Sequence, residues 1–254
     1  MQLDALVGGS LFAFLLVFVR LGSAFLVMPG IGEQFVNARF RLLLALSVSF
    51  LMMPVLKPIL PDRPPSPGDL VLLILAEAVV GIFIGTLARV MLSSLETAGF
   101  MIANQLGLSA AQSFNPAMAS PGNALSGLLG ILAMVMLFAT NLHHMLIMGI
   151  VDSYSLFAPG QGLPVGDATE HLARTVAQSF LVGIQLSAPF VVIGLLFYLG
   201  IGLVSRLVPQ IQIFFVTAPI QILLGTLLFS LSLSGLMLFW LAAFEDQLVT
   251  ILQP

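Results

Sequence analysis

The sequence lacks cysteine and contains few charged residues, and each of these absences excludes a class of protein. Without cysteine the chain forms neither disulfides nor thiolate metal sites. Charged residues make up 7% of the 254 positions and apolar residues 59%, with a mean hydropathy of +1.13. Soluble domains usually carry about 25% charged residues. The composition therefore excludes an ordinary soluble domain.

Basic residues are also scarce, with eight Lys and Arg against eleven Asp and Glu, a formal net charge of −3. Nucleic-acid-binding domains usually carry a basic patch, so we expect no nucleic acid among the partners. The sequence has no P-loop, no dinucleotide-binding glycine pattern and no HExxH motif. Ser109 lacks the nucleophile elbow that a hydrolase would need. We therefore predict that the chain is not an enzyme and has no catalytic residue, no cofactor and no metal site.

The most informative feature present is an uncharged stretch, because positions 97–151 hold no Asp, Glu, Lys or Arg. A charge at the bilayer centre costs about 2.5–3.5 kcal/mol, so such a stretch belongs in lipid. Its first half nevertheless carries amides and prolines, namely Asn104, Gln105, Gln112, Asn115, Pro116 and Pro121. Irregular backbone at membrane depth is tolerated only inside protein or beside a water-filled cavity. We therefore predict a broken, re-entrant-like segment that belongs to a pathway or gate.

The remaining sequence predicts an all-α membrane protein with one polytopic domain. A crossing needs about 20 apolar residues, and six apolar runs are present, near residues 10–28, 42–56, 69–92, 125–151, 176–204 and 213–244. We expect a retained first span, a loop at 152–169 and interruptions at Pro189 and Pro219. The prediction is about six hydrophobic, kinked helices with a break at 107–122.

Four charged residues fall at or near membrane depth, Arg20, Glu77, Arg89 and Glu96. One interpretation is proton coupling or contact with a substrate. The other, which we favour, is that these charges pair with one another, for instance Arg20 with Glu77, or with partner subunits, and so fix the assembly. The positive-inside bias places Arg206 and the polar turn after it in the cytoplasm.

Several short motifs occur in one order along the chain. They are Met28-Pro29 with Val36, Arg39 and Arg41; Gly99-Phe100-Met101-Ile102 with Gln105, Gly107, Leu108 and Ser109; Asn115-Pro116; Leu137-Phe138 with Asn141, His143 and His144; Ser153 with Pro159; Ser187-Ala188-Pro189-Phe190; and Arg206 through Phe214 with Pro219. In this order they resemble the FliR/SctT family of type III export-gate subunits, over the whole chain.

The resemblance implies a subunit of the flagellar export gate in the bacterial inner membrane, at the basal body. Its expected partners are FliP-like, FliQ-like and FlhB-like subunits and the lipid membrane, with unfolded rod, hook and filament proteins in transit. It also implies a FliP-like part at residues 1–170 and a FliQ-like C-terminal hairpin at 171–254. The energy for export would come from the proton-motive force and a separate ATPase.

The resemblance also assigns candidate residues. The pore or plug loop would include Gln105, Gly107, Leu108, Ser109, Phe114, Asn115 and Pro116. The cytoplasmic turn that contacts the FlhB-like subunit would include Arg206, Pro209, Gln210 and Gln212. Structural interpretations stay open beside these, a re-entrant turn for the loop and hairpin capping for the turn. Two other functions also stay open, an injectisome export-gate homologue and a secondary transporter with a midplane site.

Overall fold

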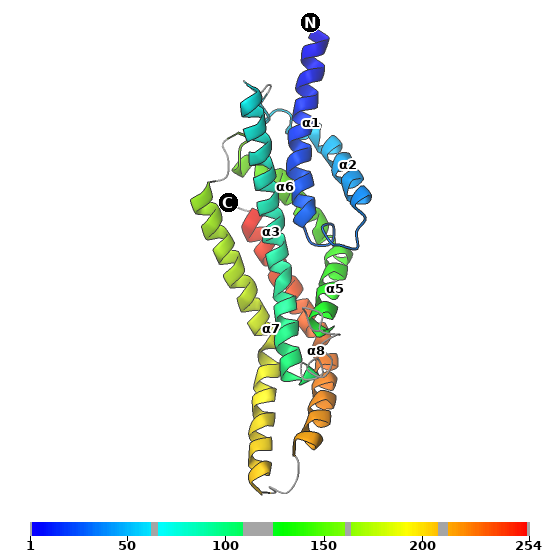
Figure 1. Cartoon of the computed structure of the whole chain (residues 1–254), viewed down its shortest axis with the longest axis vertical. Helices are drawn as coiled ribbons and strands as arrows, with labels where there is room; N and C mark the ends of the chain where they lie inside the picture. Colours follow the sequence, from blue (N-terminus) through cyan, green and yellow to red (C-terminus); the bar gives the residue numbers. More distant parts are fainter. Residues whose placement is uncertain (1, 62–65, 109–123, 161–163, 208–212, 253–254) are drawn as a thin grey trace. The chain divides into compact units, whose positions relative to one another are not determined.

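The chain is built from helices, most of them unusually long (Figure 1). The computed structural model describes residues 2–61, 66–108, 124–160, 164–207 and 213–252, and within those ranges there is no strand. The helices are α1 (Gln2–Val27), α2 (Ala38–Leu56), α3 (Pro67–Gln105), α5 (Ala124–Ala139), α6 (Leu142–Leu156), α7 (Val165–Leu207) and α8 (Ile213–Leu252). The predicted all-α fold is confirmed.

Among the described residues, five helices are long and apolar enough to cross a membrane. The count rises to six if α5 and α6, which meet at a sharp bend, are taken as one broken span. The prediction of about six hydrophobic helices is therefore confirmed. The 39 residues of α3 and the 43 of α7 correspond to about 60 Å of helix each, twice the thickness of a bilayer core.

The bend between α5 and α6 corrects one prediction, because we expected a single span over residues 125–151. The two helices meet at 77°. Asn141 sits at the break with a φ of 61°, a left-handed conformation that asparagine adopts more readily than most residues. The rings of Phe138 and His143 pack across the break with centroids 5.0 Å apart.

The predicted interruptions at Pro189 and Pro219 are also wrong, since α7 and α8 continue through them. A proline removes one helical hydrogen bond but is tolerated where neighbouring groups satisfy the freed carbonyl. The predicted loop at 152–169 is shorter than expected, because α6 runs on to Leu156 and α7 begins at Val165.

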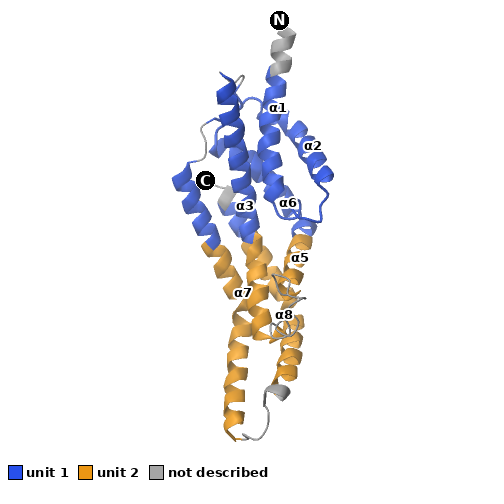
Figure 2. Cartoon of the chain, viewed as in Figure 1, with its two compact units in different colours: residues 1–91, 137–176, 246–254 blue, residues 92–136, 177–245 orange. Residues whose placement is uncertain are grey.

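The helices divide between two compact units (Figure 2). Unit 1 comprises Met1–Met91, Leu137–Val176 and Asp246–Pro254, and unit 2 comprises Leu92–Met136 and Ala177–Glu245. This division describes packing. The predicted FliP-like and FliQ-like parts describe relationship to other subunits, and they stay a prediction.

The core of unit 1 forms around α1. Five α1 side chains are completely buried: Leu16, Val17, Leu21, Ala24 and Phe25. Helix α2 packs against α1 (Figure 1). Gly85 brings α3 close to α1, because a Cβ there would lie 2.7 Å from the carbonyl oxygen of Ala24. Small residues at such positions let membrane helices approach closely.

The core of unit 2 forms around an aromatic anchor on α8. Trp240 is 1% exposed, and its Nε1 donates to Ser94 Oγ of α3 at 3.1 Å. Phe244 stacks on Trp240 with ring centroids 5.1 Å apart. Phe190 of α7 packs on Phe229 of α8 at 6.3 Å. These contacts join α3, α7 and α8 within unit 2.

Replacing Gly99 with alanine is expected to destabilise unit 2. A Cβ at Gly99 would lie 2.7 Å from Ser126 Cα and 3.0 Å from Ser126 N, backbone atoms of α5 that cannot swing aside. Overpacking of this kind costs about 1–3 kcal/mol. We expect the variant, purified in mild detergent, to aggregate about 5 °C below the parent protein in a heating series.

Gly127→Ala is the matched control, because it makes the same change on α5 where no atom lies within 4 Å of the new Cβ. Both variants gain about 1 kcal/mol of helix propensity. An equal loss of stability in the two variants would contradict the packing interpretation.

Candidate functional site

Arg20 and Glu77 form a buried ion pair in unit 1. Arg20 Nε donates to Glu77 Oε2 at 2.6 Å, and Nη2 donates to Glu77 Oε1 at 3.1 Å. Each side chain is only 1% exposed. Two parallel hydrogen bonds match the guanidinium fork to the carboxylate, which is the strongest geometry for such a pair. The pairing that the sequence analysis named is thus present, and it joins the middle of α1 to α3.

Helix α6 supplies the other partners of Arg20. Nη1 donates to Ser153 Oγ at 3.1 Å, and Nη2 donates to the carbonyl oxygen of Phe157 at 2.9 Å. The guanidinium carbon lies 3.8 Å from the centre of the Tyr154 ring, whose negative face attracts a cation. Arg20 therefore ties α1 to α3 and to α6.

Local sequence explains how α6 presents these groups. Ser153 lies in the last turn of α6, and Phe157 is the non-helical residue that follows the end of the helix at Leu156. Arg20 therefore bonds a side chain of the last turn and the backbone carbonyl just beyond it. Tyr154 is missing from the sequence-predicted site. The only sequence signal for it is rarity, since the chain has two tyrosines.

The four predicted membrane charges do not form one cluster. Arg89 is 47% exposed, and its Nη2 lies 3.2 Å from Glu33 Oε1. Glu96 is exposed on α3 beside Gly130 of α5, where a Cβ would lie 3.4 Å from Glu96 Oε1. Arg20 and Glu77 therefore pair with each other, whereas Arg89 pairs with Glu33.

Two arginines hold the segment between α1 and α2. Arg41 Nε donates to the carbonyl oxygen of Ile31 at 3.0 Å, and Arg41 Nη2 donates to that of Glu33 at 2.9 Å. Arg89 Nη1 donates to the carbonyl oxygen of Val27 at 3.1 Å. The segment between α1 and α2 has backbone carbonyls that need hydrogen-bond donors. Arg41, which belongs to the motifs that carry the family resemblance, supplies donors for two of them.

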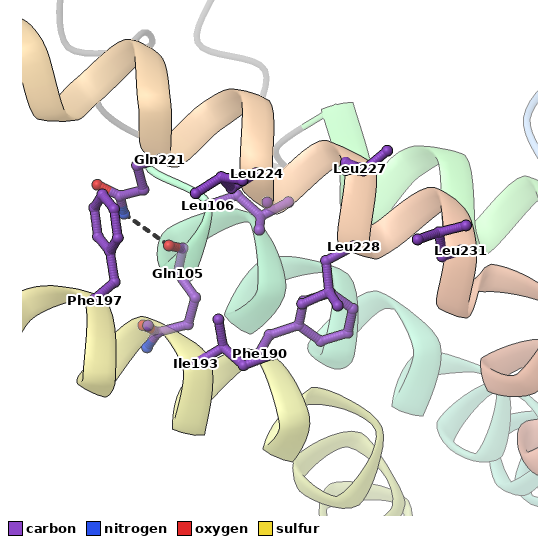
Figure 3. Close-up of a pocket in the computed structure, with 12 residues that line it drawn as sticks. Gln105, Leu106, Phe190, Ile193, Phe197, Gln221, Leu224, Leu227, Leu228 and Leu231 are labelled. Carbon is purple, nitrogen blue, oxygen red and sulfur yellow. Dashed lines mark hydrogen bonds between the residues drawn. The ribbon is translucent and has the colours of Figure 1, made fainter.

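A second candidate site lies in unit 2, at the end of α3. Gln105, Leu106, Gly194 and Gln221 are among the residues lining a largely apolar groove of about 300 Å³ formed by α3, α7 and α8 (Figure 3). Gln105 belongs to the predicted pore segment, and Gly107 and Leu108 follow it immediately. The structure therefore places the beginning of that segment against α7 and α8 within unit 2.

The other predicted site residues fall into two groups. Arg206 lies in the last turn of α7 and is exposed. Seven more lie outside the described residues: Ser109, Phe114, Asn115, Pro116, Pro209, Gln210 and Gln212.

Breaking the buried pair is expected to destabilise the protein strongly. Arg20→Met leaves Glu77 buried without its partner, and Glu77→Met does the reverse. Each single change should cost about 3–5 kcal/mol, and the double change Arg20→Met/Glu77→Met should cost less than the sum. The measurement is a heating series on the four proteins in mild detergent.

Arg89→Met removes a half-exposed arginine from its pair with Glu33 and from its bond to the Val27 carbonyl, and it should cost about 1–2 kcal/mol, less than either change in the buried pair. Strictly additive losses in the double variant, or a loss at Arg89 as large as that at Arg20, would contradict this account of the buried pair.

Comparison with known proteins agrees with the predicted resemblance. Residues 11–247 match the bacterial export proteins, family 1. The flagellar biosynthetic protein FliR of Caulobacter vibrioides is 41% identical over 233 residues, which cover 92% of this chain and 93% of that protein. FliR of Bacillus subtilis is 32% identical over 83% of this chain and 82% of its own length. Yop proteins translocation protein T of Yersinia pestis is 25% identical over 86% of this chain and 84% of its own. The chain therefore belongs to family 1 of the bacterial export proteins, together with the flagellar FliR proteins.

Proposed function

We propose that this protein is a subunit of the type III export gate of the bacterial flagellum. It forms part of the pore through which unfolded rod, hook and filament proteins leave the cell. The observation that carries the proposal is the 41% identity to a FliR protein across nearly the full length of both chains. The chain lies in the inner membrane at the base of the flagellum.

The apolar surface of α7 supports an obligate subunit rather than a free-standing protein. Exposed apolar side chains recur from Val176, 48% exposed, to Leu207, 80% exposed, whereas the first turns of α7 carry the exposed Glu170 and Arg174. The apolar positions span about 47 Å of helix, whereas the bilayer core is about 30 Å thick. Lipid alone cannot cover that length, so other subunits cover part of it. FliP-like and FliQ-like chains are the partners that this proposal assigns.

The buried charges then have a structural role in the assembly. The bonds of Arg20 to α3 and α6 hold three helices of unit 1 in one arrangement, which gives neighbouring subunits a fixed surface to pack against. Arg89 is paired with Glu33 inside unit 1, and the assembly role of Glu96 stays a prediction. The chain catalyses no reaction, and the proton-motive force and a separate ATPase supply the energy. The exposed Arg206 belongs to the turn assigned to the FlhB-like subunit.

The identities favour the flagellar branch over the injectisome, because the FliR relatives described above are closer than the Yersinia translocation protein. An injectisome homologue remains the alternative within the same family. A secondary transporter remains the alternative from a different class.

Deleting the gene is expected to abolish flagellar export. Without the gate subunit, hook and filament proteins should be made but retained, and immunoblots of the culture medium should show at least a tenfold loss. Expression of the chain from a plasmid should restore both secretion and swimming. Normal secretion of filament protein by the deletion strain would contradict the proposal. If the deletion strain secretes filament protein normally but no longer secretes virulence effectors, the chain belongs to an injectisome.

The plug assignment remains part of the proposal, and it rests on the family resemblance and the sequence. A pore for unfolded chains must exclude ions when idle, and an apolar constriction does this by excluding water. Phe114 is the one aromatic residue at positions 107–122. Phe114→Ala should therefore raise the ion conductance of membranes that contain the assembled idle gate.

Phe100→Ala is the matched control, because Phe100 is an exposed aromatic residue on α3. We expect no change of conductance in that variant. Equal conductance for Phe114→Ala and the parent gate would remove the plug assignment without affecting the export assignment.

A further inference from the structure

The C-terminal end of α3 is closed by specific hydrogen bonds. The backbone N–H of Leu106 donates to the carbonyl oxygen of Ile102 at 2.9 Å, and that of Gly107 donates to Asn104 at 3.2 Å. Gly107 has a φ of 73°, the left-handed conformation with which many helices end. The carbonyl oxygen of Gln105, the last helical residue, needs a donor from elsewhere.

Gln221 of α8 supplies that donor. Its Nε2 donates to the carbonyl oxygen of Gln105 at 2.7 Å (Figure 3). The same nitrogen donates to the hydroxyl oxygen of Tyr198 on α7 at 3.0 Å. An amide nitrogen carries two hydrogens, so both are used. One side chain therefore connects the end of α3 to α7 and α8.

The surroundings make these bonds consequential. Of the twelve residues that line the groove, Gln105 and Gln221 are the two with polar side chains. Leu106 is 4% exposed and Phe190 is 2% exposed. Gln105 and Gln221 themselves are half-buried, and Tyr198 is 51% exposed. A polar group that loses its partner beside apolar side chains is disfavoured in proportion to its burial.

Two glycines on α7 and α8 receive the side chains at the end of α3. A Cβ at Gly194 would collide with Gln105 Oε1, and a Cβ at Gly225 would collide with Leu106 Cδ2. The space that a larger residue would fill is therefore occupied by the side chains of Gln105 and Leu106. Both contacts are made by the ends of flexible side chains, so they show close packing at the end of α3 rather than a rigid fit.

We propose that Gln221 is a positioning residue of the export gate, which anchors the end of α3 between Gly194 and Gly225. It fixes the place where the chain passes into residues 109–123. The anchoring rests on the contacts of the described residues alone. The consequence for the gate rests on the proposed function.

The absence of cysteine permits a direct test of the anchor. A single cysteine introduced by Leu108→Cys reports on the end of α3 in the intact gate, in native membrane vesicles. Its alkylation by a maleimide is followed on this chain after separation from the other subunits. Gln221→Leu replaces the carboxamide with an apolar side chain of similar volume and so removes the donor. We expect the alkylation rate to rise about tenfold.

Two controls define the specificity of that change. Gln178→Leu makes the same substitution at an exposed glutamine of α7, also in unit 2, and should leave the rate unchanged. Tyr198→Phe removes one acceptor but leaves the bond to Gln105, so the rate should change less than twofold. If Gln221→Leu does not accumulate in the membrane, Gln221→Glu keeps the length of the side chain, lacks the amide donor and should show the same rise. An unchanged rate in the Gln221 variant would overturn the proposal.

The effect of Gln221 on the gate is measured as the ion conductance of the idle gate and as the secretion rate of hook protein. We expect Gln221→Leu to raise the conductance or lower secretion at least threefold, with the chain present in normal amount. A faster alkylation with both readouts unchanged would reduce Gln221 to a packing residue and overturn its positioning role. If the parent protein supports no secretion at all, the proposed function fails, and the alkylation series still tests the anchor.

Discussion

A polar group inside an apolar helix assembly must find its partner in protein, because the hydrocarbon core of a membrane offers none. Arg20 shows this constraint most clearly. The guanidinium is 1% exposed, yet it meets Glu77 of α3, Ser153 Oγ of α6 and the carbonyl oxygen of Phe157 just after α6, with Tyr154 against its face. Because these partners come from α3 and α6, satisfying one charge on α1 sets how three helices of unit 1 pack. Replacing such a pair with apolar residues is often tolerated, whereas removing one member is not. We therefore regard the pair as a device that specifies one arrangement of unit 1.

The same constraint shapes unit 2 without charges. The indole nitrogen of Trp240 finds Ser94, and the last carbonyl of α3 finds Gln221. Glycines lie beside both bonds: Gly183 of α7 faces the carbonyl oxygen of Ser94, and Gly194 of α7 and Gly225 of α8 face the end of α3. With the polar groups satisfied inside, the outer surface stays apolar over a length of helix greater than a bilayer can cover. That combination is expected of a subunit whose outer surface is shared between lipid and other chains.

Much of this fold can be predicted from the sequence, because the strongest constraints are compositional. Long uncharged apolar runs predict the helices, and two opposite charges inside such runs predict a pair at Arg20 and Glu77.

The bend between α5 and α6 could not be predicted, since it depends on Asn141 adopting a left-handed conformation that many asparagines do not adopt. Nor could the continuity of α7 through Pro189, because a proline inside an apolar run usually predicts a kink or a break. Tyr154 and Gln221 were missed because a lone tyrosine or glutamine in an apolar run carries no spacing signal. The plug loop and the cytoplasmic turn stay predictions, carried by the family resemblance.

The central claim, that this chain works only as part of a larger export gate, is tested most directly by what accompanies it out of the membrane. The chain would be tagged at its chromosomal locus, extracted from native membranes in mild detergent and measured by mass spectrometry, first as an intact complex and then after digestion. The account predicts a complex several times heavier than the 27.0 kDa chain, containing FliP-like and FliQ-like subunits. Recovery of the chain alone, or only as a small homo-oligomer, would contradict the account and favour an independent transporter.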